Sequence, residues 1–175
     1  DGIFRVSGSL STARRLRAAI DAADDDDERA DVALRNAGAH DVAGVLKLWL
    51  RELPEPLLTF GVYDEVVRHH GAAVAGAHAD AAAAAEAWRS LLQDRLPPLA
   101  TLTLLHLLPL LSRTAELSEC NRMTAKNVAI VFGPTLLRPE VDSLDTVMHI
   151  PHVNACAETL VAHADALVAA LAKQQ

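Results

Sequence analysis

One arginine near the start of the chain stands in a setting suited to a group that reaches into a partner. In the segment DGIFRVSGS, Arg5 directly follows an apolar Ile-Phe pair and has Gly2 and Gly8 on either side. The apolar pair can anchor the segment in a core, and the glycines allow it to bend. An arginine that only improves solubility needs no such anchor. We therefore interpret Arg5 as a cation on a short, bendable and anchored segment.

Two further cations lie one helical turn apart in the segment VLKLWLREL. Lys47 and Arg51 are separated by four positions, so a helix would place them on one face. Like charges at this spacing repel each other by about 0.2–0.5 kcal/mol. Solvent that screens both charges is one explanation, and a negative group or a set of carbonyls between them is the other. From this helix alone we favour the first.

The sequence lacks the patterns of a self-contained active site. It contains no Walker-type phosphate loop, no GxGxxG and no GxSxG around a serine. No histidine pairs with a cysteine at zinc spacing, and the adjacent His69 and His70 would diverge on a helix, so we expect no metal site. The acidic run at 24–28 lacks the pattern of a calcium loop and indicates a solvated loop. These absences favour a domain that binds another macromolecule or completes a partner's active site.

The composition predicts helices packed on helices. The 175 residues are 51% hydrophobic, with many alanines and leucines, but only 3% aromatic, which is unlike a β-rich chain. We expect one all-α domain over 1–175, a length that can bury a sizeable core. The net charge of −7 argues against nucleic-acid binding.

Cysteine content and apolar runs indicate where the protein works. The two cysteines form no disulfide framework, so we expect a reduced, cytoplasmic protein. The most apolar stretch, 99–112, is shorter than the ~20 residues that a bilayer requires, so we expect a core helix and no membrane insertion.

Residues 42–53 form the clearest amphipathic helix. Asp41 is the expected N-cap, and the apolar residues, Trp49 among them, recur at helical spacing as one stripe. Pro54 and Pro56 end the pattern. Other helices are expected from Ser9 or Ser11, in the alanine-rich segment 71–89 with Trp88 as its anchor, from Pro97-Pro98 to a kink or end at Pro109, and as one final helix over 154–175.

The segment 121–139 is ambiguous by pattern. Its run VAIVF could be a short buried strand. Alternatively, Thr124 caps a helix and Gly133-Pro134 stops it, which would place Asn127 in the first turn. A buried asparagine usually satisfies nearby backbone groups, so a structural role is the default for Asn127.

Three blocks taken together resemble the Rho-family GTPase-activating (RhoGAP) domain. DGIFRVSGS, VLKLWLRELPEPLLTF and NRMTAKNVAIVFGPTLL occur in the order and approximate spacing of that family, and the resemblance runs from residue 1 to about residue 170. It implies an all-helical bundle, with VAIVF in a helix. Relative to the family pattern, the chain begins directly before the GIFR block, without the family's N-terminal helix.

The resemblance also implies roles for five residues. Arg5 matches the family's catalytic arginine finger. Lys47 and Arg51 match the cations thought to support the finger loop and line the GTPase-facing groove, Asn127 resembles the GTPase-contacting amide, and Pro134 matches the proline that ends its motif.

The function implied is activation of a GTP-loaded Rho, Rac or related small GTPase, not an enzyme activity of the chain alone. GTP and Mg²⁺ would be carried by the partner, so the domain itself needs no cofactor. The alternative is a catalytically silent module of the same fold that only holds a GTPase or another signalling protein. A stand-alone hydrolase is disfavoured, because no nucleophile or metal constellation is found in the sequence.

Overall fold

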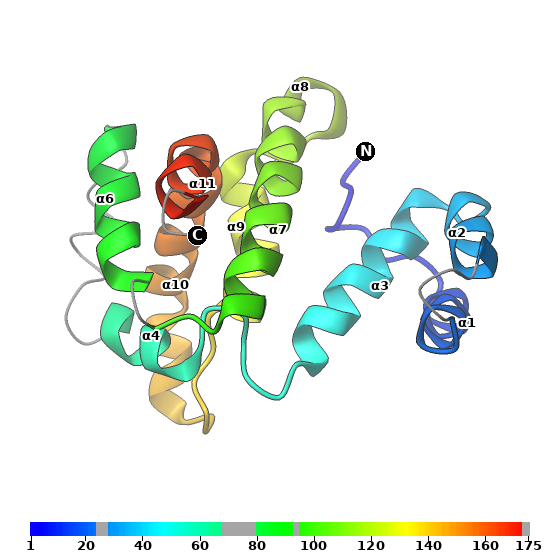
Figure 1. Ribbon diagram of the computed structural model, residues 1–175, viewed down its shortest axis with the longest axis horizontal. Coiled ribbons are helices and arrows are strands. Elements are labelled where there is room, and N and C mark those ends of the chain that lie inside the picture. Colours follow the sequence, from blue (N-terminus) through cyan, green and yellow to red (C-terminus); the bar gives the residue numbers. More distant parts are fainter. Residues whose placement is uncertain (24–27, 68–79, 93–94, 173–175) are drawn as a thin grey trace.

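The computed structural model describes residues 1–23, 28–67, 80–92 and 95–172, and within these ranges all regular structure is helical, with no strand. The predicted all-α fold is therefore confirmed. Figure 1 shows the helices in place. They are α1 (Leu10–Asp21), α2 (Glu28–Arg35), α3 (Ala39–Glu52), α4 (Phe60–Glu65), α6 (Ala81–Leu92), α7 (Pro98–Glu116), α8 (Ser118–Asn121), α9 (Ala125–Leu136), α10 (Leu144–Ala162) and α11 (Ala164–Ala172).

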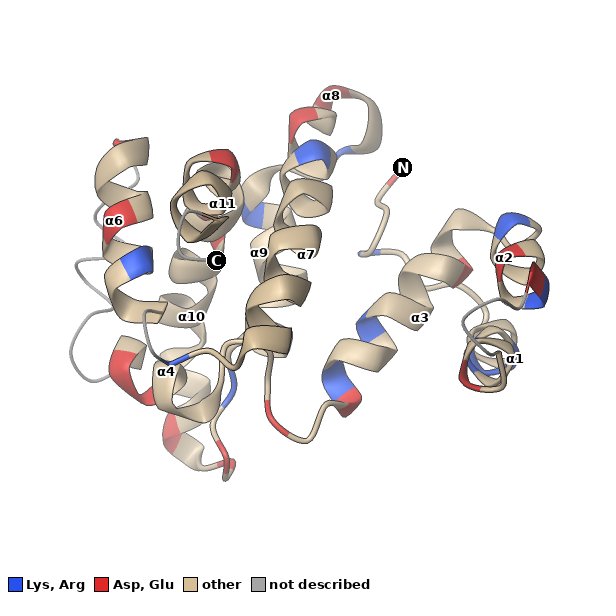
Figure 2. Ribbon diagram, in the orientation of Figure 1, with Lys and Arg blue, Asp and Glu red and all other residues tan. Residues whose placement is uncertain are grey.

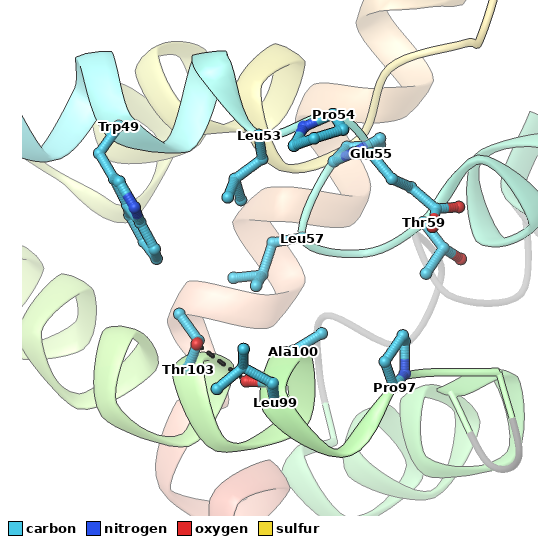
Figure 3. Close-up of a pocket in the computed structure, with 11 residues that line it drawn as sticks. Trp49, Leu53, Pro54, Glu55, Leu57, Thr59, Pro97, Leu99, Ala100 and Thr103 are labelled. Atoms are coloured by element: carbon cyan, nitrogen blue, oxygen red, sulfur yellow. Dashed lines mark hydrogen bonds between the residues drawn. The ribbon is translucent and has the colours of Figure 1, made fainter.

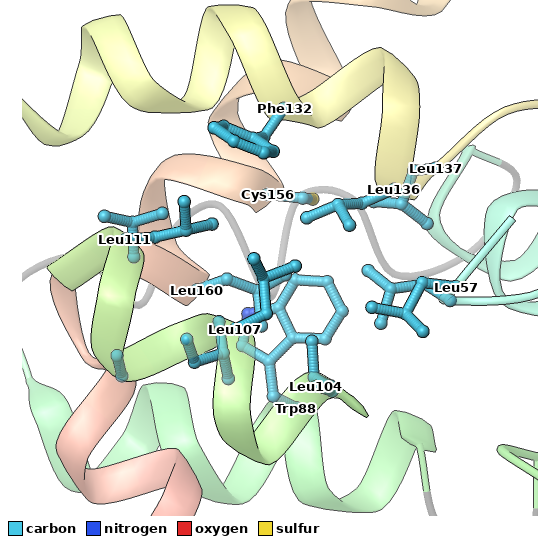
Figure 4. Packing of buried hydrophobic residues seen from close by; sticks show 14 of the residues in the cluster. Leu57, Trp88, Leu104, Leu107, Leu111, Phe132, Leu136, Leu137, Cys156 and Leu160 are labelled. Atoms are coloured by element: carbon cyan, nitrogen blue, oxygen red, sulfur yellow. The ribbon is translucent and has the colours of Figure 1, made fainter. Parts of the chain in front are cut away.

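The main core lies among α6, α7, α9, α10 and α11. Trp88 of α6, Phe132 of α9 and Leu160 of α10 are each no more than 1% exposed and converge on α7 (Figure 4). Trp88 anchors α6 as predicted, whereas the expected helical residues 71–79 lie outside the described ranges. Cys156 is fully buried here, and burial raises the pKa of its thiol to about 12, which keeps it protonated and unreactive.

α3 joins this core to a smaller one at the other end of the molecule. One side of α3 buries Ala43 and Leu50 in the main core, while Val45 packs with Ala13 and Leu16 of α1 in a second cluster. α1 and α2 thus reach the rest of the fold through α3, which also packs on α9 (Figure 1). A helix held on two sides is a rigid platform for the side chains on its remaining face.

Two of the expected helix caps are present: Ser9, one of the two candidates offered for the first helix, and Thr124, which belonged to the helical alternative for 121–139. The hydroxyls of Ser9 and Thr124 accept from the N–H groups of Thr12 and Asn127, both at 3.3 Å. The prediction for Asp41 was wrong, because α3 begins three residues earlier, after an N-cap at Gly38 that offers no side chain.

The predicted stop at Gly133-Pro134 was wrong, and of the kink or end predicted at Pro109 the end does not occur. α7 continues through Pro109 to Glu116, and α9 continues through Gly133 and Pro134 to Leu136. Gly133 serves helix packing instead: a Cβ there would lie 2.9 Å from Oδ1 of Asn154 on α10. VAIVF is helical, as the family resemblance implied.

The C-terminal segment is two helices where one was predicted. α10 begins at Leu144 and the chain bends by 76° between α10 and α11. The bend returns α11 to α6 and α7 and buries Leu167 and Leu171. No described helix is by itself long and apolar enough to cross a bilayer; α10 and α11 reach that length and apolar content only as a bent pair.

The burial of α7 predicts that two of its leucines contribute very differently to the stability of the domain. Leu108 is fully buried, whereas Leu110 is 46% exposed. Leu108→Ala should destabilise the domain by about 2–5 kcal/mol, because it removes buried methyl groups and leaves a cavity. Leu110→Ala should cost less than about 1 kcal/mol. Urea unfolding followed by circular dichroism measures both, and equal losses would contradict the packing described here.

Candidate functional site

Arg5 stands at the tip of a tight, hydrogen-bonded turn. The N–H of Arg5 donates to the carbonyls of Gly2 (3.0 Å) and Ile3 (2.9 Å), and the N–H of Val6 donates to that of Gly2 (2.8 Å). Two residues have positive φ, Gly2 at 71° and Phe4 at 67°. Arg5 is exposed, and its guanidinium has no hydrogen-bond or ion-pair partner in the described part of the chain.

The unusual backbone at Phe4 is held by burial of its ring. A positive φ at a non-glycine residue costs about 1–3 kcal/mol. The Phe4 side chain is only 5% exposed and meets Phe132 of α9 edge to face, with ring centroids 5.0 Å apart. Burial of such a ring contributes about 1.5–3 kcal/mol and an aromatic pair about 0.5–1.5 kcal/mol more, which offsets the strain. The N–H of Gly2 also donates to the Asn121 carbonyl at 2.7 Å.

Lys47 fastens the same turn to α3. Its ammonium donates a hydrogen bond to the carbonyl of Phe4, the residue directly before Arg5. Burial, and secondarily the neighbouring charge of Arg51, lower the pKa of Lys47 from its usual 10.5. Of the two explanations for the Lys47–Arg51 spacing, the structure therefore supports the second for Lys47, whose charge binds a backbone carbonyl. Arg51 is exposed and has no partner among the described residues.

Asn127 supports the other side of the turn. Its Nδ2 donates to the Arg122 carbonyl at 3.1 Å, which helps to hold Arg122 in a left-handed conformation next to Asn121. Asn121 is the residue whose carbonyl binds Gly2. Oδ1 of Asn127 has no partner in the described ranges, so this half-buried amide can still accept a hydrogen bond from another molecule.

Pro134 lies apart from this cluster. It is exposed on α9, seven residues beyond Asn127 and thus on the same helix face, about 10 Å further along the axis. It borders a separate cavity of about 240 Å³ that Tyr63 and Asp142 also line. The structure thus brings together Arg5, Lys47 and Asn127 around one turn, places Arg51 beside Lys47, and leaves Pro134 on the flank.

A polar groove of about 280 Å³ opens beside the turn. Segment 7–10, which follows Arg5, forms one wall and α3 the other. Its polar and charged lining residues are Ser7, Ser9, His40, Asp41, Lys47 and Arg51. Figure 2 shows basic positions (blue) on α3 and on the N-terminal segment that passes next to it. The groove is therefore suited to a polar or acidic surface of a partner.

A second, apolar cavity of about 320 Å³ lies between the end of α3 and the start of α7 (Figure 3). Trp49 borders it and is 45% exposed, so the predicted apolar stripe of α3 is only partly buried. Leu53, Leu57 and Leu99 supply much of the remaining surface. Among the described residues, Glu55 is its only charged lining residue, so they offer this cavity no cation for a phosphate.

Three contacts around the turn were not predicted from the sequence. Phe132 was assigned to no site, Asn121 was not singled out, and Asp41 was taken for a cap. Oδ1 of Asp41 in fact accepts from the Ser9 N–H at 2.6 Å. An asparagine at the end of a short helix is a recognisable turn signal, but nothing in the local pattern links Asp41 to a residue 32 positions earlier.

The Lys47 environment predicts a pKa change in a neighbouring variant. Arg51→Ala removes a like charge, so the pKa of Lys47 should rise toward 10.5 but stay below it, because burial remains. Between the folded-state pKa and 10.5 the unfolded chain binds more protons, so the Lys47 contribution to stability increases with pH in that window. NMR titration of the Lys47 side chain measures the shift. Arg35→Ala, on α2, should leave it unchanged.

Comparison of the sequence with known proteins finds a matching family model and curated relatives of the same kind. The family model of the RhoGAP domain matches residues 1–141. The chain is 38% identical over 182 residues to Rho GTPase-activating protein 45 of Mus musculus, covering 93% of this chain and 16% of that protein. It is 40% identical over 162 residues to Rho GTPase-activating protein 27 of the same species, covering 92% and 17%. It thus spans a small part of these curated relatives.

Solved structures agree with the fold. The crystal structure of human Rho GTPase activating protein 15 superposes with a TM-score of 0.73 at 32% identity, covering 95% of this chain and 74% of that one. The BH domain of GRAF, the GTPase regulator associated with focal adhesion kinase, gives a TM-score of 0.73 at 25% identity, with 95% and 84% covered. The resemblance inferred from three sequence blocks is confirmed, and the chain belongs to the RhoGAP domain family.

Proposed function

We propose that this domain activates GTP hydrolysis by a Rho-family small GTPase and that Arg5 acts in the partner's active site. The observation that carries the proposal is the contrast at the turn. Phe4 is buried and its carbonyl is bound by Lys47, while the next residue, Arg5, is exposed and unpaired among the described residues. A turn that fixes its backbone so firmly and frees one guanidinium is suited to deliver that group to another molecule.

The chemistry explains why the group is an arginine. In the transition state for GTP hydrolysis, negative charge builds on the γ-phosphoryl oxygens and the β–γ bridging oxygen. A planar guanidinium that stays protonated can donate two directed hydrogen bonds to these oxygens and helps exclude water. Because this stabilisation appears mainly in the transition state, it raises the rate more than the affinity.

The remaining candidates would hold the GTPase. Lys47 supports the turn, Arg51 presents a free cation at the groove, and the unpaired Oδ1 of Asn127 accepts from the partner. Pro134 would extend the contact along the exposed face of α9. In this proposal the partner is GTP-loaded and carries the nucleotide and Mg²⁺ itself, the domain supplies no cofactor, and the reaction takes place in the cytoplasm.

The first prediction concerns the rate. An arginine supplied in trans to Ras accelerates hydrolysis by roughly 10³–10⁵. Arg5→Ala should therefore lose most of the stimulated rate, and Arg5→Lys should behave nearly the same, because an ammonium lacks the planar fork. Affinity for the GTP-loaded GTPase should change little. Single-turnover hydrolysis at saturating domain, over a panel of Rho-family GTPases, measures this.

Arg35→Ala is the matched control, because it removes an exposed arginine from α2, outside the turn and the groove. Wild-type domain that binds a GTP-loaded GTPase without accelerating hydrolysis would contradict the activator proposal. That result would instead support the binding-only alternative.

The second prediction concerns binding. Asn127→Ala should weaken binding to the GTP-loaded GTPase by about 5–30-fold, because the partner loses the acceptor Oδ1 and the Arg122 carbonyl loses its donor Nδ2. Asn36→Ala, at an exposed position after α2, is the control. Isothermal titration calorimetry with a non-hydrolysable GTP analogue gives both affinities. An unchanged affinity would show that Asn127 does not contact the GTPase.

A further inference from the structure

A second contact attaches the segment that carries Arg5 to α3, on the C-terminal side of the arginine. The N–H of Ser9 donates to Oδ1 of Asp41 at 2.6 Å. Asp41 lies in the first turn of α3, six residues before Lys47, whose ammonium binds the Phe4 carbonyl. One helix therefore holds the chain on both sides of Arg5.

The close approach at this second attachment requires a glycine. A Cβ at Gly8 would lie 2.4 Å from Oδ1 of Asp41, 2.7 Å from its backbone nitrogen and 2.8 Å from the carbonyl carbon of His40. Two of these three atoms belong to the helix backbone and cannot move aside. Gly8 thus lets the segment lie directly on the start of α3, where the Ser9 N–H reaches the carboxylate.

The carboxylate is well placed to keep this contact. Asp41 occupies the third position of α3, where unpaired helix N–H groups favour a negative charge. The N-cap residue, Gly38, has no side chain and therefore cannot replace Asp41 as the acidic group at the start of α3. Hydrogen bonds from an N–H to a carboxylate are about twice as strong as neutral ones. Ser9 also caps α1, so the contact joins the end of the segment to the starts of two helices.

We propose that Asp41 is a positioning residue for Arg5: by holding Ser9 and Gly8 against α3, it limits residues 5–8 to the few arrangements in which Arg5 can reach the partner's nucleotide. This inference rests on the proposed function. Lys47 fixes the residue before Arg5, and Asp41 fixes the chain four residues after it. A side chain delivered from a segment held at both ends loses less conformational entropy on docking than one delivered from a free end.

The proposal predicts a loss of rate with little loss of binding. Asp41→Ala should lower the single-turnover rate at saturating domain by about tenfold, the order expected when a charge-assisted hydrogen bond is lost. The affinity for the GTP-loaded GTPase should stay within about threefold of wild type. Asp41→Asn keeps an acceptor in the same place and should retain most of the rate. A rate for Asp41→Asn as low as that for Asp41→Ala would overturn the hydrogen-bond mechanism.

Two controls separate positioning from general damage. In the Arg5→Ala background, Asp41→Ala should cause no further loss of rate, because a positioning residue acts only through the group it positions. Asp165→Ala removes an exposed acidic residue from the first turn of α11 and should leave the rate unchanged. A further loss in the Arg5→Ala background, or an equal loss in Asp165→Ala, would overturn the proposal.

A second measurement needs no GTPase. Amide hydrogen exchange of the free domain should show faster exchange at Ser9 and its neighbours in Asp41→Ala and in Gly8→Ala, but not in Asp165→Ala. Unchanged exchange at Ser9 in Asp41→Ala would overturn the attachment itself. If the wild-type domain fails to accelerate hydrolysis, the proposed function fails, and exchange still decides whether Asp41 holds the segment.

Discussion

The candidate site depends on the way Phe4 is held. Its ring is buried against Phe132, its carbonyl receives the ammonium of Lys47, and its positive φ turns the chain sharply between these two contacts. The left-handed conformation is unfavourable for a phenylalanine, so it persists only because both contacts oppose relaxation. As a consequence the next residue, Arg5, points to solvent with its backbone fixed. The turn therefore combines an exposed side chain with a fixed backbone.

α3 connects this turn to the rest of the molecule. Its two buried sides belong to different clusters, one with α9 and one with α1, and its polar face carries the residues that hold the N-terminal segment. A helix fixed by two cores moves little, so the distance between its attachment points is nearly constant. The same helix presents Trp49 to an apolar cavity that has no role in the proposed chemistry. Charge, not cavity size, therefore distinguishes the candidate site.

The incorrect sequence predictions share a physical cause. Gly133 and Pro134 form a good local stop, yet α9 continues through them. Gly133 is explained by packing, because a Cβ at this position would be too close to α10. The break at His163 has no strong local signal, since it exists to bury α11 against α6 and α7. Asp41 is a good cap residue by type, but the helix starts earlier and its carboxylate serves a distant backbone N–H. At Gly133-Pro134 and at Asp41, tertiary contacts outweigh local preferences of about 1–3 kcal/mol.

The sequence by itself determined the helical class and the family, because composition and ordered motifs are local properties of the chain. It offered Ser9 or Ser11, and Thr124, as helix caps, and the structure uses Ser9 and Thr124. It also singled out Arg5, Lys47, Arg51, Asn127 and Pro134 as candidates. Only the tertiary structure decided that Lys47 binds the Phe4 carbonyl, that Asn127 reaches the turn through Arg122, and that Pro134 lies apart. These relations join residues distant in sequence, and their geometry exists only once the helices have packed.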